Sequence, residues 1–205
     1  MFGYDDPPGG HAEVAFYRVL VNEEALIGAI GSGFALMQAR LGPGRLHHCA
    51  RLVGHGDRAI EEMRKRGTSR ELYGKSLLSL EGNSERLARC RVIVQRSTLL
   101  VLHAAAVFDE HLASHGRKPS SELLRALAVV KVDVPGSMQS CLDCAIQLHG
   151  GGGLSFDHPL AVMWTACRTL RIVDGADEVH LRNLAKLERT FQNPIDSPVK
   201  LISKL

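Results

Sequence analysis

Hydrophobic positions recur every three or four residues along most of the chain, which is the period of an amphipathic α-helix. The pattern predicts long helices over residues 45–66, 83–113 and 120–148. It predicts shorter helices over residues 159–173 and 176–191. Because the connections between these helices are short, we expect neighbouring helices to run antiparallel. The predicted fold is therefore mainly α, an antiparallel helical bundle.

Glycine and proline mark the expected ends and breaks of these helices. A short helix over 34–39 is expected to stop at Gly42-Pro43-Gly44, and Gly67 is expected to end the first long helix. Pro135 predicts a kink inside the third long helix, and the run of glycines at 150–153 predicts its end.

The residues before the first helix follow a different pattern. Residues 11–21 are rich in Val, Phe and Tyr and partly alternate, which predicts one strand or two short ones. A lone strand pair is marginal in water, so its partner strands would lie outside this chain. We therefore divide the chain into a β segment over 1–30, a helical bundle domain over 31–192 and a tail over 193–205.

Charge and composition narrow the possible partners. The chain has 205 residues, 45% of them hydrophobic, and a formal net charge of +3. Its basic residues form no long block, which argues against nucleic acid as a partner. No apolar run reaches about 18 residues, so no transmembrane segment is predicted.

The cysteines are predicted to be reduced. Their number is odd, at five, and they fall at helical positions, as expected of an intracellular protein. Cys141-x-x-Cys144 lies within a predicted helix and has no second pair at zinc spacing, so we interpret it as packing.

Three segments exceed what packing requires, and the first is a charged turn over residues 70–75 after the first long helix. The glycines at 150–153 would let a backbone approach a diphosphate or a flat ring closely, although they could also form a simple helix stop. Asp174 precedes Gly175 between the last two helices, where it is either a catalytic carboxylate or an N-cap. His47 and His48 are adjacent on a helix and point about 100° apart, and we predict no metal site.

Four ordered motifs carry a resemblance to a known family. Over about residues 11–191 the chain resembles the C-terminal domain of acyl-CoA dehydrogenases, within the branch of family members 10 and 11 and a plant peroxisomal relative. The motifs are Gly42-Pro43-Gly44-Arg45-Leu46-His47-His48-Cys49, Ser69-Arg70-Glu71-Leu72-Tyr73-Gly74-Lys75, Ala145-Ile146-Gln147-Leu148-His149-Gly150-Gly151 and Asp174-Gly175-Ala176-Asp177-Glu178-Val179-His180.

The resemblance implies a flavoenzyme that introduces a double bond between Cα and Cβ of an acyl-CoA. A carboxylate takes the α-proton while the β-hydrogen leaves as hydride. The family's usual base lies in a Tyr-Glu-Gly-Thr motif, and Val173-Asp174-Gly175-Ala176 stands here instead. Asp174 inherits the role of base, and its side chain is one methylene shorter.

The resemblance also implies the cofactor, the substrate and the assembly. The cofactor is FAD, the substrate is an acyl-CoA, and the enzyme is a homodimer or homotetramer. The residues that would bind FAD are Arg70, Tyr73, Gln147, Gly150, Gly151, Ala176 and Glu178. Arg45 and Gly175 would contact the acyl-CoA.

The family's domain order implies that residues 1–30 are the last part of a middle β-domain. We therefore expect the chain alone to bind FAD weakly and to be inactive. Two alternatives stay open, a non-catalytic helical module that oligomerises with full-length paralogues and a peroxisomal acyl-CoA oxidase. Ser203-Lys204-Leu205 matches the address recognised by the peroxisomal import receptor, unless it is a chance match at a chain end.

Overall fold

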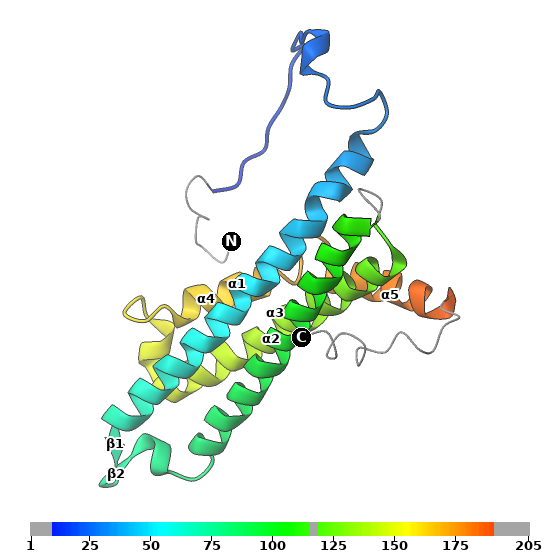
Figure 1. The fold of residues 1–205 in the computed structure, drawn as a ribbon. Coiled ribbons are helices and arrows are strands. Elements are labelled where there is room, and N and C mark those ends of the chain that lie inside the picture. The colour runs from blue at the N-terminus through cyan, green and yellow to red at the C-terminus, as the bar shows by residue number, and fades with distance from the viewer. Residues whose placement is uncertain (1–9, 115–118, 191–205) are drawn as a thin grey trace.

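Three long helices build the body of the molecule (Figure 1). The structure is a computed structural model, and it describes residues 10–114 and 119–190. Successive long helices run in opposite directions and pack against one another. They are α1 (Gly33–Ser69), α2 (Asn83–Ser114) and α3 (Ser121–His149). The predicted mainly α, antiparallel bundle is confirmed.

Shorter elements close the two ends of this bundle. Between α1 and α2 lie a two-stranded hairpin, β1 (Glu71–Leu72) and β2 (Lys75–Ser76), and the 3₁₀ helix η2 (Leu77–Ser79). After α3 come the 3₁₀ helix η3 (Gly150–Leu154), α4 (Leu160–Thr169) and α5 (Asp177–Thr190). Both α4 and α5 pack against α3, so α3 is the central helix.

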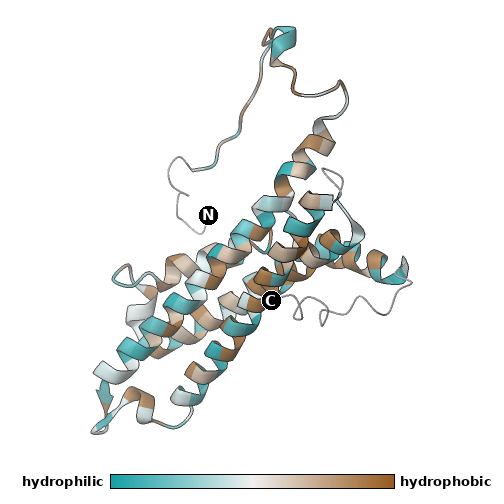
Figure 2. Ribbon diagram, in the orientation of Figure 1, coloured by the Kyte–Doolittle hydropathy of each residue, from teal (hydrophilic) through white to brown (hydrophobic). Residues whose placement is uncertain are grey.

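The core is aliphatic and sits between the three long helices. Side chains such as Leu52, Val94 and Met138 are fully or almost fully buried and come from α1, α2 and α3 in turn. Hydrophobic and hydrophilic residues alternate around each helix (Figure 2). Burial of one apolar stripe per helix is therefore the main stabilising term, at about 25 cal/mol per Å² of apolar surface.

The first long helix differs from the prediction. Residues 34–39 and 45–66 belong to one continuous helix, so the expected break at Gly42-Pro43-Gly44 is wrong. Pro43 is exposed, so its ring projects away from the bundle. A helix-interior proline costs about 3 kcal/mol, and packing of the long helix offsets this loss. The helix also continues two residues beyond Gly67, to Ser69.

The third helix follows the prediction closely. The Ser120 hydroxyl accepts a hydrogen bond from the Leu123 backbone N–H and caps the helix. Pro135 lies inside it and is fully buried. Gly150 ends it with a φ of 65°, a conformation that favours glycine.

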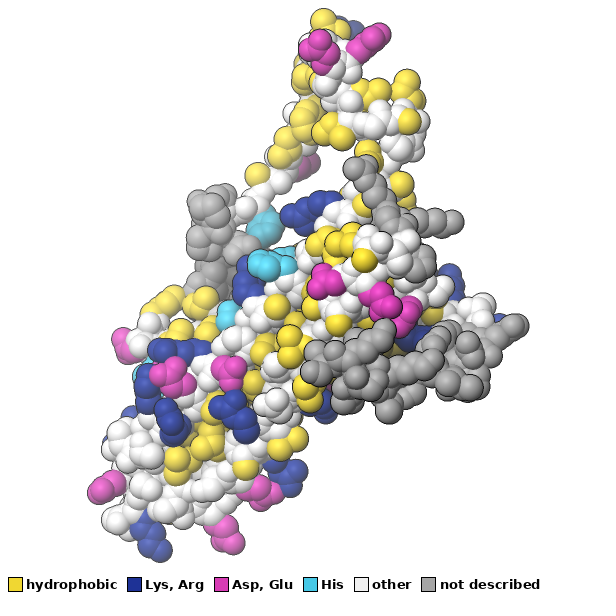
Figure 3. Space-filling view, in the orientation of Figure 1, with side chains coloured by type: hydrophobic (Ala, Val, Ile, Leu, Met, Phe, Trp, Pro, Cys, Tyr) yellow, Lys and Arg dark blue, Asp and Glu magenta, His cyan; other side chains and the backbone are white. Residues whose placement is uncertain are grey.

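The predicted β segment contains no strand within residues 10–30. Only the 3₁₀ helix η1 (Glu23–Ala25) forms there, and the segment extends away from the bundle (Figure 1). Its apolar side chains are exposed, with Phe16 at 83% and Tyr17 at 85% (Figure 3). A strand needs a partner for its backbone hydrogen bonds, and the described residues supply none.

The second helix is also apolar on part of its outer surface. By length and composition alone α2 could cross a membrane, with a mean hydropathy of 1.4 in its most apolar window, of which 28% is buried. A single such helix is weak evidence, because core helices meet the same criterion. Here the inner face of α2 packs on α1 and α3, while Val92, Leu99 and Leu102 are exposed.

Candidate active site

Asp174 lies at the junction between α4 and α5. Its backbone is left-handed, with a φ of 60°, and Gly175 follows with a φ of 107°. Aspartate tolerates this region better than most residues, and glycine is unrestricted there. A Cβ at residue 175 would lie 2.7 Å from His180 Nε2, so glycine is also required by the close approach of that ring. The two residues turn the chain sharply and bring Asp174 back towards α1.

Three side chains from different helices hold the backbone of this junction. Arg45 Nε of α1 donates a hydrogen bond to the Asp174 carbonyl oxygen at 2.9 Å. His180 Nε2 of α5 lies 3.3 Å from the same oxygen. Lys131 of α3 is fully buried, and its Nζ donates to the carbonyl oxygens of Leu170 and Gly175, the latter at 3.1 Å. The junction is therefore a fixed part of the bundle.

The Asp174 carboxylate faces α1. Its Oδ2 lies 3.2 Å from His48 Nε2, and only 13% of the Asp174 side chain is exposed. The angle of this contact is not that of a hydrogen bond, so Oδ2 has no hydrogen-bond partner within the described part of the chain. Since no N–H at the start of α5 donates to Oδ2, the structure does not support the N-cap alternative. A Cβ at Gly44 would lie 3.6 Å from Oδ2, which is an ordinary van der Waals contact, so the approach does not depend on this glycine.

Burial and nearby charges shift the pKa values of the basic groups around Asp174. Burial lowers the pKa of His48 below its ordinary value, and the nearby Asp174 charge only partly opposes the shift. Burial likewise lowers the pKa of His180, of Lys131 and of Arg45. The neutral form of each imidazole is therefore favoured beside this carboxylate.

Two of the residues expected to contact FAD, Arg70 and Tyr73, lie just beyond the C-terminal end of α1. Arg70 directly follows α1 and is exposed, and its carbonyl oxygen accepts a hydrogen bond from Leu77 N–H at 2.8 Å. Tyr73 is at the turn of the β1–β2 hairpin, with a φ of 53° and 95% exposure. Both side chains are thus open to a ligand.

The glycine segment lies beyond the C-terminal end of α3. Gln147, Gly150 and Gly151 are exposed. A Cβ added at Gly150 or at Gly151 would meet no other atom within 4 Å. Gly153 has a structural role instead, because a Cβ there would lie 2.7 Å from the Ile146 carbonyl oxygen. The open backbone at 150 and 151 fits the prediction of a ligand contact.

The predicted site residues thus form two groups. Arg45, Asp174, Gly175 and Ala176 lie together at the α4–α5 junction beside α1, and Glu178 is exposed on the first turn of α5. Arg70 and Tyr73 lie some 25 residues further along the chain from Arg45, a rise of roughly 35 Å along a helix. Gln147, Gly150 and Gly151 also lie outside the Asp174 group, at the end of α3. One chain does not close these groups around a single ligand.

A small polar cluster lies near the glycine segment. Glu62, His149 and His158 place possible ligand atoms within 4.8 Å of one another. Glu62 is already paired with Arg58, whose Nη2 lies 2.8 Å from its Oε1. Because that carboxylate is neutralised, we assign no metal here, and the absence of a metal site stays a prediction.

Sequence reasoning missed the side chains that position Asp174. Lys131 offered a signal, because a lysine directly after Val130 lies next to the apolar stripe of the third helix. A charge there implies a buried partner. His48 and His180 carried no comparable signal, since their contact with residue 174 depends on how the helices pack.

Comparisons with known proteins identify the family of this chain. Residues 31–187 match the family model described as acyl-CoA dehydrogenase, C-terminal domain. The chain is 45% identical over 188 residues to the probable acyl-CoA dehydrogenase IBR3 of Arabidopsis thaliana, covering 92% of this chain and 22% of that protein. It is 41% identical to mouse acyl-CoA dehydrogenase family member 10, covering 97% of this chain and 18% of that protein. The chain therefore spans about a fifth of the length of these relatives.

Solved structures share the helical fold. A putative acyl-CoA dehydrogenase from Mycobacterium abscessus superposes with a TM-score of 0.70 at 45% identity, covering 78% of this chain and 37% of that one. Butyryl-CoA dehydrogenase from Megasphaera elsdenii superposes with a TM-score of 0.69 at 24% identity, covering 78% and 39%, which supports the fold alone. The chain therefore belongs to the acyl-CoA dehydrogenase family, and residues 31–187 are its C-terminal helical domain.

Proposed function

We propose that this chain supplies the catalytic base of an FAD-dependent acyl-CoA dehydrogenase, and that Asp174 is that base. One observation carries the proposal. The Asp174 carboxylate is largely buried, and its Oδ2 has no hydrogen-bond partner among the described residues. Arg45 donates a hydrogen bond to the Asp174 carbonyl oxygen, and Lys131 donates one to the carbonyl oxygen of the next residue, Gly175. A buried acceptor without a donor is costly and uncommon away from functional sites.

The chemistry follows from a carboxylate held beside a thioester. The α C–H bond breaks, the proton moves to an Asp174 carboxylate oxygen, and the electron pair is delocalised onto the thioester oxygen. When bound, FAD supplies the acceptor for the hydride that leaves the β-carbon. Arg45 and Gly175 stand next to the base, where the resemblance places the acyl-CoA.

The residues present fit the cofactor. Arg70 would pair with the FAD pyrophosphate, because its guanidinium is exposed and can donate two parallel hydrogen bonds. Tyr73, Gln147 and the open backbone of Gly150 and Gly151 would add contacts at the same end of the chain's long helices. Ala176 and Glu178 would contact the flavin nearer the base. Because the two groups are separated, we infer that a complete FAD site also needs parts outside this chain.

A pair of acid-to-amide variants tests the proposed base. The test uses the longest natural polypeptide that contains this chain, loaded with FAD, and follows the loss of flavin absorbance after addition of acyl-CoA. Asp174→Asn should reduce the rate at least about 100-fold, because removal of a general base costs about 10²–10⁴-fold. Asp143→Asn, at an exposed carboxylate of α3, is the matched control, and its rate of flavin reduction should equal that of the wild type. Equal rates for Asp174→Asn and the wild type would show that another group is the base.

The same preparation separates the competing functions. A helical module that only oligomerises with longer paralogues would bind no FAD and reduce none with any acyl-CoA. An oxidase would release hydrogen peroxide in air in proportion to the substrate consumed, whereas a dehydrogenase would need an added electron acceptor. The 205-residue chain alone should be colourless and inactive.

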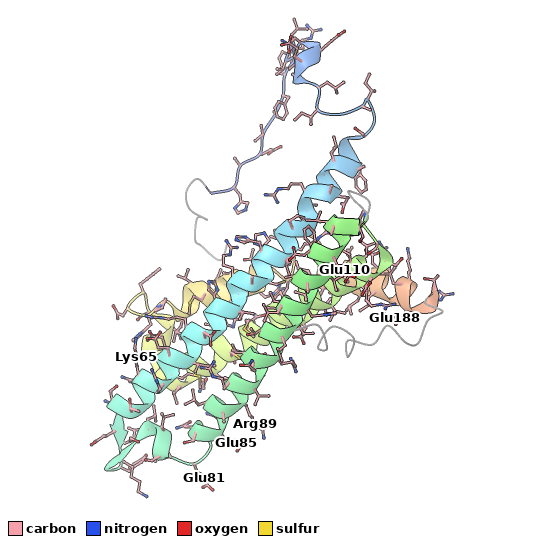
Figure 4. All side chains as sticks on the ribbon, in the orientation of Figure 1. Lys65, Glu81, Glu85, Arg89, Glu110 and Glu188 are labelled. Carbon is pink, nitrogen blue, oxygen red and sulfur yellow. The ribbon has the colours of Figure 1, made fainter. Side chains whose placement is uncertain are left out.

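We also propose that α2 contributes to the contact between subunits of a homodimer or homotetramer. Its residues Val92, Leu99 and Leu102 are apolar and exposed. Burial of these side chains against a second copy of the protein would be more favourable than their contact with water. Figure 4 shows Glu85 and Arg89 near the start of α2, and their ion pair would lie at the rim of the contact. Sedimentation velocity of the wild type and of Leu99→Lys tests the proposal, and an unchanged mass would contradict it.

The peroxisomal location is a separate proposal. It rests on Ser203-Lys204-Leu205, which lies outside the described residues. A fluorescent protein fused before the chain should collect in peroxisomes, and Leu205→Glu should disperse it. Cytosolic fluorescence of the unaltered fusion would contradict the proposal.

A further inference from the structure

His48 is the side chain that faces the carboxylate of the proposed base. It comes from α1, one turn after Gly44, and its Nε2 lies 3.2 Å from Asp174 Oδ2. A quarter of the His48 side chain is exposed, so the ring is partly shielded from water. Its neighbour His47 is exposed and points elsewhere. Only one of the two adjacent histidines is therefore placed to act on Asp174.

The other ring nitrogen of His48 fixes which nitrogen carries the proton. Arg51 Nη2 lies 3.0 Å from His48 Nδ1, one turn further along α1. A guanidinium can only donate, so Nδ1 must be the acceptor in this contact. The proton of a neutral His48 ring is then on Nε2, the nitrogen that faces Asp174. The lowered pKa of His48, caused mainly by burial, agrees with a neutral ring.

The other groups at the junction bind the backbone rather than the carboxylate. Arg45 Nε and His180 Nε2 contact the Asp174 carbonyl oxygen, and Lys131 Nζ contacts the next carbonyl. They fix the backbone of the junction and make no hydrogen bond to the carboxylate. Within the described residues, His48 Nε2–H is the donor that can orient Oδ2. Its present misalignment is of the kind that tightens when substrate binds.

We propose that Arg51 and His48 form a positioning relay for Asp174, in which Arg51 sets the tautomer of His48 and the His48 Nε2–H orients the carboxylate. This relay rests on the proposed function, because it assumes that Asp174 is the base. A neutral donor holds the carboxylate through one lone pair of Oδ2 without protonating it, so another carboxylate lone pair stays available to accept the substrate proton. His48 touches neither FAD nor acyl-CoA in this proposal and is a positioning residue.

The tautomer can be measured without any activity. In the chain labelled with ¹⁵N-histidine, two-bond ¹H–¹⁵N correlation spectra near neutral pH should show His48 protonated on Nε2 and unprotonated on Nδ1. Arg51→Met, at an exposed position, should convert His48 to a mixture of tautomers. His47 should be unchanged in that variant. A proton on His48 Nδ1 in the wild type, or an unchanged His48 in Arg51→Met, would overturn the relay.

Three variants of the FAD-loaded natural protein test the effect on the base. His48→Leu removes the donor and should slow flavin reduction about 100-fold, as expected when a reacting group is misplaced by about 1 Å. His48→Gln keeps an N–H donor at the place of Nε2 and should recover most of that loss. His47→Gln is the control and should react like the wild type.

The outcomes separate the relay from the proposed function. If Asp174→Asn reacts like the wild type, the proposed base fails whatever His48 does. If Asp174→Asn is inactive while His48→Leu reacts like the wild type, the base stands and the relay is wrong. If His48→Leu is unfolded, the spectra of Arg51→Met decide, since that variant changes only an exposed side chain.

Discussion

At Gly56 of α1, side chains of both α2 and α3 lie close to the helix backbone. A Cβ added there would lie 2.4 Å from Met138 Sδ of α3 and 2.8 Å from Val94 Cγ2 of α2. Real Cβ atoms do not come so near to other heavy atoms, so Gly56→Ala forces the Met138 and Val94 side chains, or their helices, to shift. We expect this single methyl group to lower the stability of the bundle.

The magnitude follows from two opposing effects. Alanine in place of glycine within a helix gains about 0.5–1 kcal/mol through lower unfolded-state entropy. Overpacking a well-packed core costs about 1–3 kcal/mol, and the flexible Met138 side chain can absorb part of it. Gly54→Ala is the matched control, since Gly54 is exposed on the same helix and a Cβ there meets nothing within 4 Å. Gly54→Ala should therefore be stabilising by about 0.5–1 kcal/mol.

Urea unfolding followed by far-UV circular dichroism measures both variants. Their difference in unfolding free energy isolates the overpacking and should be about 1–3 kcal/mol, with Gly56→Ala the less stable. If Gly56→Ala were as stable as Gly54→Ala, the three helices would not meet at this glycine. The packing of α1 against α2 and α3 would then need revision.

Three further predictions concern pH, a buried charge and a helix cap. The pKa values of His149 and His180 are lowered by burial, so the folded chain binds fewer protons than the unfolded chain below about pH 6.5. The stabilisation that these neutral histidines contribute should be complete above that pH. It should be lost as the pH falls through their pKa values in the folded chain, and thermal unfolding at several pH values will measure this loss. Lys131→Met leaves the buried Leu170 carbonyl oxygen and the partly buried Gly175 carbonyl oxygen without this donor, and should cost about 1–3 kcal/mol, lessened by removal of a buried charge. Ser120→Ala removes the cap of α3 and should cost about 1 kcal/mol, measured in urea.

Each of these predictions has a control and a contradicting result. Constant stability between neutral and mildly acidic pH would mean that the buried histidines are protonated as easily in the folded chain. Lys65→Met alters an exposed lysine and should change stability by less than about 0.5 kcal/mol. Ser121→Ala is the neighbour of the cap, and a loss equal to that of Ser120→Ala would exclude capping as the cause.

The sequence predicted the helices well because their apolar stripes are long and regular. Both ends of α3 followed from Ser120 and Gly150, whose local chemistry decides the backbone conformation. The break predicted at Pro43 failed, since packing of the residues on both sides outweighs one lost hydrogen bond. No strand forms over residues 11–21, because a strand depends on partner strands, and none is present among the described residues.

The candidate site was predictable only in part. Motif order gave Asp174 and Arg45, and the structure brings them into contact through the Asp174 carbonyl oxygen. The approach of His48 to Asp174 joins residues far apart in the chain and depends on the packing of α1 against the α4–α5 junction. Periodicity alone contains no information on that packing, so no pattern could reveal the relay.

The unbroken course of α1 couples the two groups of site residues mechanically (Figure 1). Each residue of a helix adds about 1.5 Å of length and about 100° of rotation. One residue inserted between Arg45 and Arg70 would therefore swing the hairpin about a third of a turn relative to Asp174. Natural variants of this domain are expected to conserve the length of α1 strictly and to accept insertions in the connections between helices.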